Sequence, residues 1–500
     1  MQNIAIFNGV TFETPNGRRL FSNLNFTLGS QLTALVGPNG VGKTCLAQLL
    51  SGELLPTEGN IRRNSSLTFF PQRQTPEPVT VEQFLSSDYQ WSELGDKLLA
   101  AIDRQSLCTH LSGGEWMRVR LARVVDAGFL ILDEPTNDLD RDARTLLLEF
   151  LRHRKAGTLL ISHDRECLAL CDEVLELSNK GLSKFGGGWN LYEEAKQRER
   201  SNLNTALEIA QRDREKAKAA RVEKMARQEK RNRKGAEAVK RGGLPKILIG
   251  ARKRRAQVTT GKLDTSTLEC ASNAVREAFM AFQEMKIDPL MYTDLVGSPI
   301  PSQKLVVASH NFNVRFQDWL YHEDLNFNWR GNIRLALKGA NGSGKSTLIK
   351  AILGQDLGET RGELRRSPLK TLYIDQRCAQ LDDTKNILEN VRDVSILDES
   401  EVRNGLAKFL FTKDVVFQKV GLLSGGERLR AALARGLLST EKPEFLVLDE
   451  PTNNLDLPNI EFLENLIAEF KGALLIISHD EIFLKNCGVT EEFLIRTERR

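Results

Sequence analysis

Predominantly apolar runs of strand length recur along the chain, and each is followed by a Gly-rich or charged turn. In the first part of the sequence these runs are QLTALV (31–36), FLIL (129–132) and TLLIS (158–162). Continuous apolar runs are typical of parallel strands that are buried on both faces of a sheet. The run CLAQLL (45–50), which follows the first Gly-rich loop, has the pattern of a helix. We therefore predict an α/β fold here.

The motifs of this α/β unit occur twice in the chain. GPNGVGKT (37–44) recurs as GANGSGKS (339–346), LSGGE (111–115) as LSGGE (423–427), FLILDEPTNDLD (129–140) as FLVLDEPTNNLD (445–456), and LLISHD (159–164) as LIISHD (475–480). The offset grows from 302 at Lys43 and Lys345 to 316 at His163 and His479. A period this long indicates a duplicated domain, not a solenoid repeat. We predict two such domains, at residues 1–190 and 301–500.

Residues 191–300 are a different kind of segment. No Gly or Pro occurs from Leu191 to Lys234, and a helix of that length would span ~66 Å. After a stretch that contains Gly and Pro, a second helix is indicated by the capping pair Ser266 and Glu269 and by an apolar seam at spacings of three and four. We predict a long α-helical hairpin linker whose tip lies near residues 235–262.

The charge of the chain is concentrated in this linker. Residues 191–260 carry a net charge of +12, although the whole chain carries only +4. Such a basic segment suits a polyanion, and we predict that the tip binds RNA. The candidate residues are Arg241, Lys246, Arg252, Lys253, Arg254 and Arg255. The alternative is a solvated helical spacer in which the apolar tip residues pack into the turn of the hairpin.

The two Gly-rich loops match G-x-x-x-x-G-K-[ST] between a strand and a helix, which is the P-loop pattern. Their glycines let backbone N–H groups turn toward phosphate oxygens, and the lysines neutralise the β- and γ-phosphates. Thr44 and Ser346 supply a hydroxyl to Mg²⁺. The predicted loop residues are Gly37, Asn39, Gly40, Gly42, Lys43 and Thr44, and Gly339, Asn341, Gly342, Gly344, Lys345 and Ser346. An ordinary Gly-rich turn does not explain two copies with matching downstream motifs.

An acidic pair follows a buried strand in each repeat. Asp133 and Asp449 end the strands and are predicted to hold Mg²⁺, while Glu134 and Glu450 polarise the attacking water. Adjacent residues at a strand end face opposite ways, so the pair can divide this work. His163 and His479 end another strand, where an imidazole can contact the γ-phosphate. A lone histidine there is usually a surface residue, but its recurrence favours the functional interpretation.

Each LSGGE motif precedes an Arg-rich helix. Ser112 with Gly113 and Gly114, and Ser424 with Gly425 and Gly426, place a hydroxyl and free N–H groups at a helix N-terminus, which is a natural anion site. Taken alone, the motif is also compatible with an ordinary N-cap. Together with the P-loop and the acidic pair, it closely resembles the signature of the ABC ATPase family.

The resemblance to ABC cassettes covers about residues 1–190 and 304–500. It implies two ATP molecules sandwiched between the cassettes, with Lys43 sharing its ATP with Ser424–Gly426 and Lys345 sharing its ATP with Ser112–Gly114. It also implies nucleotide and metal contacts for Gln72 and Gln376, D-loop roles for Asp140 and Asp456, and stacking on adenine by Phe12 and Phe316. Either phenylalanine could instead be a core residue. Both catalytic glutamates are present, so neither site is expected to be degenerate.

Two cassettes, EPTN-x-LD in both, and a long charged linker resemble the ABC-F family. The resemblance implies an ATP-bound state on the ribosome, with the linker near the peptidyl-tRNA and the peptidyl-transferase centre. The partners are then rRNA and peptidyl-tRNA, and the chain is a monomer whose cassettes pair intramolecularly. Family members include translation factors and antibiotic-resistance factors, and either ATP or GTP is compatible with the motifs.

Composition excludes some other classes of protein. No run approaches the ~18 apolar residues that cross a bilayer, so we expect no membrane domain, and we expect a cytoplasmic location. None of the seven cysteines forms a C-x-x-C pair, which argues against a zinc site. The alternative of a DNA-repair or chromosome ATPase is also disfavoured. Proteins of that class carry zinc modules or very long coiled coils within a split cassette, whereas each cassette here is contiguous and has no zinc-spaced cysteines. The remaining alternative is a soluble tandem-cassette subunit that energises a membrane transporter.

Overall fold

The computed structural model describes residues 3–72, 74–85, 93–100, 102–125, 127–137, 139, 141–154, 156–199, 297–340, 342–453 and 455–496, together with scattered positions between 201 and 230. The chain forms two compact units, of which one consists of Met1–Tyr192 with Pro289–Arg500 and the other of Glu193–Asp288. The first unit contains both sequence repeats. The second lies within the segment that is predicted to be the linker.

The first cassette contains two sheets. In the smaller sheet, β1 (Ala5–Glu13) pairs antiparallel with β2 (Arg19–Leu28) and β4 (Glu58–Arg63). The larger sheet has the order β5-β6-β7-β3-β8-β9, and only β8 and β9 pair antiparallel. Its strands are β3 (Leu32–Val36), β5 (Leu67–Phe70), β6 (Phe129–Asp133), β7 (Thr158–Ile161), β8 (Glu173–Ser178) and β9 (Gly181–Gly186).

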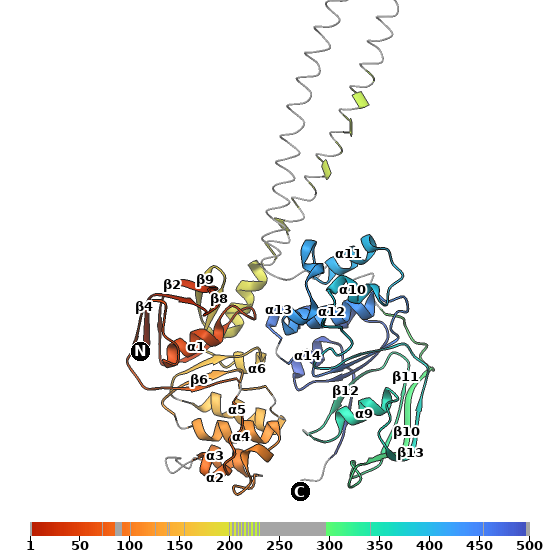
Figure 1. The fold of residues 1–500 in the computed structure, drawn as a ribbon, viewed down its shortest axis with the longest axis horizontal. Helices are drawn as coiled ribbons and strands as arrows, with labels where there is room; N and C mark the ends of the chain where they lie inside the picture. Colours follow the sequence, from red (N-terminus) through yellow and green to blue (C-terminus); the bar gives the residue numbers. More distant parts are fainter. Residues whose placement is uncertain are drawn as a thin grey trace, which may run out of the picture. The chain divides into compact units, whose positions relative to one another are not determined.

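The helices of the first cassette pack on both faces of the larger sheet (Figure 1). They are α1 (Lys43–Ser51), α2 (Val81–Leu85), α3 (Glu93–Leu99), the 3₁₀ turn η1 (Cys108–His110), α4 (Gly113–Val124), α5 (Arg141–His153) and α6 (Arg165–Leu168). Successive residues of β6 alternate between the faces. Phe129 and Ile131 join the core that contains α1 and β1, while Leu130 and Leu132 join the core that contains α4 and α5. This is why the strand is apolar up to its last residue, Asp133.

The second cassette repeats this plan. β10 (Leu305–Arg315) pairs antiparallel with β11 (Leu325–Arg330) and β13 (Glu359–Arg366). The larger sheet is parallel, in the order β14-β15-β16-β12-β17. Its strands are β12 (Arg334–Lys338), β14 (Thr371–Ile374), β15 (Phe445–Asp449), β16 (Ala473–Ile477) and β17 (Glu491–Leu494). The helices are α9 (Lys345–Ile352), α10 (Ile387–Arg392), α11 (Glu399–Lys408), α12 (Gly425–Leu437), α13 (Leu457–Glu469) and α14 (Glu481–Asn486), with 3₁₀ turns η2 (Lys413–Phe417) and η3 (Val420–Leu422).

The predicted fold class of two α/β cassettes is confirmed. Residues 188–199, which run from the end of the first cassette into the linker, are helical, as are the described positions between 201 and 230. The tip near residues 235–262 and the predicted return helix lie outside the described residues, and so do all six candidate RNA-binding residues. Every helix in the described part of the chain is too short or too polar to cross a lipid bilayer.

Candidate nucleotide-binding sites

Each Gly-rich loop makes a tight turn between a buried strand and a helix. Gly42 and Gly344 precede α1 and α9 in left-handed conformations, with φ of 107° and 90°. Glycine is the residue that adopts this conformation without strain. A Cβ atom at Gly344 would also lie 2.7 Å from Leu320 and 2.8 Å from Tyr321. The glycines therefore let the backbone N–H groups of the loop gather at the helix N-terminus, which is an arrangement suited to phosphate.

The two P-loop lysines are buried and bend back onto their own loops. Lys43 Nζ donates hydrogen bonds to two loop carbonyl oxygens at 2.7 and 3.2 Å, and Lys345 Nζ donates to two at 2.7 and 3.0 Å. Burial lowers the pKa of Lys43, although the attraction of Glu134, Asp456 and Asp133 opposes this shift. The loop carbonyls thus hold each ammonium group at the centre of its own phosphate-binding turn.

A hydroxyl and a carboxylate meet beside each lysine. Thr44 Oγ1 donates to Asp133 Oδ2 at 2.7 Å, and Ser346 Oγ donates to Asp449 Oδ2 at 3.1 Å. Burial raises the pKa of both aspartates, and the hydroxyl bonds oppose the shift. In both cassettes the P-loop hydroxyl and the strand-end aspartate, each of which was predicted to hold Mg²⁺, therefore lie side by side, and they are the hard oxygen donors that Mg²⁺ prefers.

The glutamates leave the strands through a left-handed turn. The φ angles of Glu134 and Glu450 are 50° and 49°, values that are uncommon for residues other than glycine. Glu134 Oε1 lies 3.3 Å from His163 Nε2, and Glu450 Oε1 lies 3.4 Å from His479 Nε2. Backbone strain of this kind concentrates at functional sites. The turn separates the glutamate from the preceding aspartate and directs it to the histidine.

Burial sets the protonation of the first glutamate–histidine pair. It raises the pKa of Glu134 to about 8, although the nearby Lys43 ammonium opposes this. Burial, followed by the repulsion from Lys43, lowers the pKa of His163 to about 3. The imidazole is therefore neutral at physiological pH, and the carboxyl must lose a proton before it can act as a base.

Both LSGGE motifs form N-caps. Ser112 caps α4 and Ser424 caps α12, each in a reciprocal capping box with the glutamate three residues later. Glu115 Oε2 accepts from the Ser112 N–H at 2.9 Å, and the Glu427–Ser424 bond has the same length. The hydrogen bonds from Ser112 lower the pKa of Glu115. The terminal glutamate of the motif thus has a structural role, because it shapes the turn that presents the two glycines.

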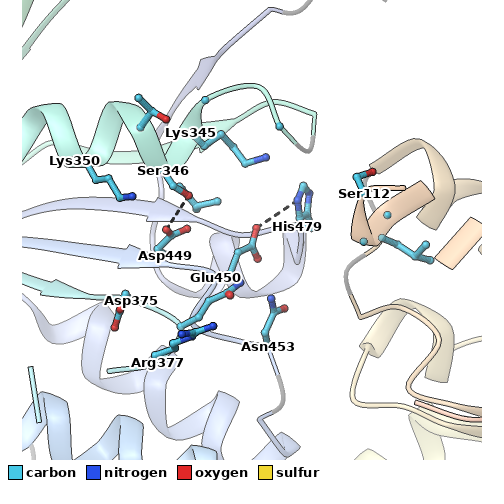
Figure 2. Close-up of a pocket in the computed structure, with 18 of the residues that line it drawn as sticks. Ser112, Lys345, Ser346, Lys350, Asp375, Arg377, Asp449, Glu450, Asn453 and His479 are labelled. Carbon is cyan, nitrogen blue, oxygen red and sulfur yellow. Dashed lines mark hydrogen bonds and ion pairs between the residues drawn. The ribbon is translucent and has the colours of Figure 1, made fainter. Parts of the chain in front are cut away.

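One cavity of about 650 Å³ joins motifs from both cassettes (Figure 2). From the second cassette it is lined by the P-loop with Lys345, and by Asp449, Glu450 and His479. From the first cassette it is lined by Ser112, Gly113 and Gly114, and Figure 2 shows Ser112 opposite Lys345 and His479. The structure therefore places the first signature at the second P-loop.

The first P-loop is contacted by the other cassette. The Asn39 N–H donates to Asp456 Oδ2 at 3.0 Å. Asp456 is 1% exposed and also caps α13. A second cavity of about 330 Å³ is lined by Gln72 of the first cassette and Gly425 of the second, together with Gln376. The contact of the first P-loop with the second cassette is therefore made by Asp456, while Gly425 of the second signature lines a cavity with Gln72.

The two phenylalanines that were expected to stack on adenine lie in different environments. Phe12 is 7% exposed, and its ring stacks on Phe21 at 6.1 Å in the core. Phe316 is 64% exposed and follows β10. Because the core covers the faces of the Phe12 ring, we exclude Phe12 from the proposed site and keep Phe316. Asn341 of the second P-loop lies outside the described residues.

The strand pairing explains why these phenylalanines are not equivalent. In each cassette a backbone N–H of the first strand, at Gly9 or at Asn311, donates to an asparagine side chain of the second strand, at 2.8 or 2.9 Å. Matched on this bond, Phe12 corresponds to the buried Val314, and Phe316 corresponds to Thr14. Counting residues back from the P-loops gives the same match, because the offset is 302 both at Gly9 and Asn311 and at Lys43 and Lys345.

The larger cavity is also lined by residues that were not predicted from the sequence, and Lys350, Tyr373 and Arg377 are among them. Arg377 directly follows the predicted site residue Gln376, so its place in the site could have been inferred from the motif. Tyr373 lies on β14 and pairs with Val447 of the neighbouring strand. This placement depends on the order of strands in the sheet, which the sequence pattern does not reveal.

Comparison with known proteins also relates both cassettes to ABC proteins. The "ABC transporter" family model matches residues 21–137 and 322–453. The ribosome protection protein VmlR of Bacillus subtilis is 27% identical over 97% of this chain and 85% of that protein. The ATP-binding protein Uup of Haemophilus influenzae is 28% identical over 93% of this chain and 74% of that protein.

Among solved structures, the archaeal ribosome recycling factor aABCE1, in complex with the ribosomal stalk protein aP1, matches with a TM-score of 0.61 at 17% identity. The match covers 98% of this chain and 88% of that one. At this identity the likeness concerns the fold. The fold and the motifs define a tandem-cassette ABC protein. The chain belongs to the ABC-F family.

The pKa of Glu134 predicts a pH dependence for the first site. In a Glu450→Gln variant, where turnover depends on Glu134, we expect kcat/KM for ATP to rise about tenfold from pH 7 to pH 9, because the carboxylate form increases as pH passes the free-enzyme pKa of about 8. Glu134→Gln/Glu450→Gln serves as the background control. A flat profile across this range would contradict the predicted protonation state.

Proposed function

We propose that this protein hydrolyses ATP with Mg²⁺ at two sites, each composed of the P-loop of one cassette and the signature of the other. The observation that carries the proposal is the cavity shared by the Lys345 loop and Ser112–Gly114. A site of this kind is complete only when the cassettes pair. Closure would then depend on nucleotide, because its phosphates would bridge the two anion-binding turns.

The residues at each site fit a nucleotide with its metal. The buried ammonium groups of Lys43 and Lys345 suit the phosphates. The hydroxyl–carboxylate pairs Thr44–Asp133 and Ser346–Asp449 suit Mg²⁺. The predicted metal contacts of Gln72 and Gln376 remain part of the proposal. When bound, MgATP supplies the phosphoanhydride bond to be broken and a metal that neutralises its charge.

The glutamates and histidines perform the proton chemistry in this proposal. Ionised Glu134 and Glu450 orient a water molecule and accept its proton as it attacks the terminal phosphate. The imidazoles, 3.3 and 3.4 Å away, hold these carboxylates in place and face the phosphate. His163 is neutral at physiological pH, so it adds no net charge beside Lys43.

A bulky side chain in the signature tests the crosswise pairing. In a Glu134→Gln background, where only the second site turns over, Ser112→Arg should lower kcat more than tenfold, because the arginine fills the cavity beside Lys345. Ser424→Arg in the same background is the matched control and should have a smaller effect. In a Glu450→Gln background the two effects should exchange. Selective damage by Ser112→Arg to the first site would refute crosswise pairing.

We further propose that the ATP-bound form acts on the ribosome, in regulation or rescue of translation or in protection against antibiotics. The support comes from the relatives, because VmlR is named as a ribosome protection protein and the fold matches that of a ribosome recycling factor. The linker tip would then lie near the peptidyl-tRNA and the peptidyl-transferase centre. The basic residues at Arg241, Lys246 and 252–255 would contact rRNA or tRNA.

A hydrolysis-deficient variant tests the ribosomal role. With ATP, Glu134→Gln/Glu450→Gln should co-sediment with ribosomes and inhibit growth when expressed, because the variant binds ATP but does not hydrolyse it and stays in the ATP-bound state. The matched control adds Lys43→Met/Lys345→Met and should lose both effects. Normal growth and protein synthesis at high expression would contradict the proposal. Co-purification with a membrane permease would favour the transporter alternative.

The role of the tip is tested by removing its charge. Changing residues 252–255 to Gln should weaken ribosome binding and reduce its salt dependence, because each lost phosphate contact lowers the log–log slope by about 0.7 to 0.9. The matched control removes four exposed lysines of the second cassette, Lys413, Lys419, Lys442 and Lys471. ATPase activity away from the ribosome should be unchanged. Binding equal to that of the unmodified protein at every salt concentration would show that the tip is a spacer.

A further inference from the structure

Arg144 on α5 connects the histidine segments of the two cassettes. Its Nε and Nη2 donate to the two carboxylate oxygens of Asp164 at 2.7 and 2.9 Å. Its Nη1 donates to the backbone carbonyl oxygen of His479 at 2.5 Å. Asp164 directly follows His163 and caps α6. One guanidinium group therefore bonds to the residue after the first histidine and to the backbone of the second.

The environment of Arg144 favours a fixed geometry. Arg144 is 8% exposed, and a further carboxylate, Glu166, lies 3.2 Å from Nη2. Burial opposes the charge, but the bonds to Asp164 and the attraction of Asp164 and Glu166 outweigh it and raise the pKa of Arg144. A buried charge that lost one partner would be strongly destabilising, so the ion pair holds the guanidinium in one orientation. The Nη1 group that donates to the carbonyl oxygen of His479 is therefore held in the same fixed orientation.

The residue equivalent to Arg144 in the second cassette cannot make this connection in the opposite direction. The offset of 316 that relates the cassettes in this region matches Arg144 to Ile460, which is a buried aliphatic residue. An isoleucine side chain has no hydrogen-bond donor. The second cassette therefore cannot use this position to hold the carbonyl group of His163. At this position of the helix, therefore, the first cassette supplies a donor to the histidine of the second site and the second cassette does not.

The location of Arg144 relates it to catalysis. It lines a small cavity of about 70 Å³ together with Glu134, Glu450, His163 and His479. These are the two glutamate–histidine pairs of the proposed sites. The carbonyl that Arg144 holds belongs to His479, whose Nε2 lies 3.4 Å from Glu450 Oε1. A shift of the His479 backbone would therefore change the position of its imidazole relative to Glu450.

We propose that Arg144 is a positioning residue acting across the cassette pair, which sets the geometry of the His479–Glu450 pair and makes turnover at the second site depend on the pairing of the first cassette. This inference rests on the proposed hydrolysis at two sites. It also makes the two sites unequal. The second site is aligned by the other cassette through Arg144, and the first site lacks the equivalent bond.

Another buried ion pair between the cassettes provides the control. Arg165 Nη1 and Nη2 lie 2.6 and 3.2 Å from the carboxylate oxygens of Glu464. Arg165 and Glu464 are 9% and 6% exposed. The double substitution Arg165→Met/Glu464→Met removes both charges together and leaves neither buried without a partner. It loosens the same interface without breaking the bond to His479.

The experiment measures Arg144→Met separately at each site. In a Glu134→Gln background, where the second site turns over, kcat should fall at least tenfold while KM for ATP changes less than threefold. In a Glu450→Gln background, where the first site turns over, kcat should fall less, because Asp164 beside His163 loses Arg144 but keeps its bonds from the N–H groups of α6. The control Arg165→Met/Glu464→Met should affect both sites to a similar degree. Equal losses at both sites with Arg144→Met, or no loss at either, would overturn the role of Arg144.

Arg144→Lys gives a second measure that does not depend on removing the charge. A lysine can pair with Asp164, but it lacks the planar fork that reaches Asp164 and the His479 carbonyl together. The same selective loss at the second site is therefore expected, and full recovery of that site would overturn the proposal. If the single and double glutamate variants hydrolyse ATP as fast as the unmodified protein, the two-site proposal itself fails, which is a separate outcome.

Discussion

The central strands of each cassette are buried on both faces, and the rest of the site depends on this constraint. All five residues of β6 are buried, and four of the five residues of β15 are buried. A strand enclosed between two cores can carry polar groups only where it ends. The Asp–Glu pair and the histidine lie at such ends, at the same edge as the P-loop, because β3, β6 and β7 run parallel. The chemistry is gathered at one edge because the interior excludes it.

Local backbone geometry then separates residues that are adjacent in the chain. Asp133 remains in the strand register and meets Thr44, whereas Glu134 adopts a left-handed conformation and meets His163. The second cassette has the same arrangement at Glu450. Two neighbouring acidic side chains thereby enter different environments, one suited to a metal and the other to proton transfer. The strained backbone persists because the strands on either side determine its position.

The pairing of the cassettes introduces an inequality that the duplicated motifs do not contain. The proposed catalytic residues are the same in both repeats, but the charged residues that join the repeats are not. Arg144 and Arg165 of the first cassette correspond to Ile460 and Glu481 of the second. Both arginines contact the second cassette, at the His479 carbonyl and at Glu464. The two proposed catalytic sites are thus held together by an interface that is not symmetric.

Motifs of the sequence by themselves determined the α/β class, the duplication and most of the nucleotide-site residues, because these depend on local patterns. A Gly-rich turn, a strand-end Asp–Glu pair and a helix-capping serine each need only a few neighbouring residues. The environments of Phe12 and Tyr373 and the contacts of Arg144 required the tertiary structure. Strand register, strand order and cassette pairing bring together residues that are far apart in the chain, such as Arg144 and His479. Whether a ring is buried or a charge is paired depends on those distant neighbours, which no local pattern specifies.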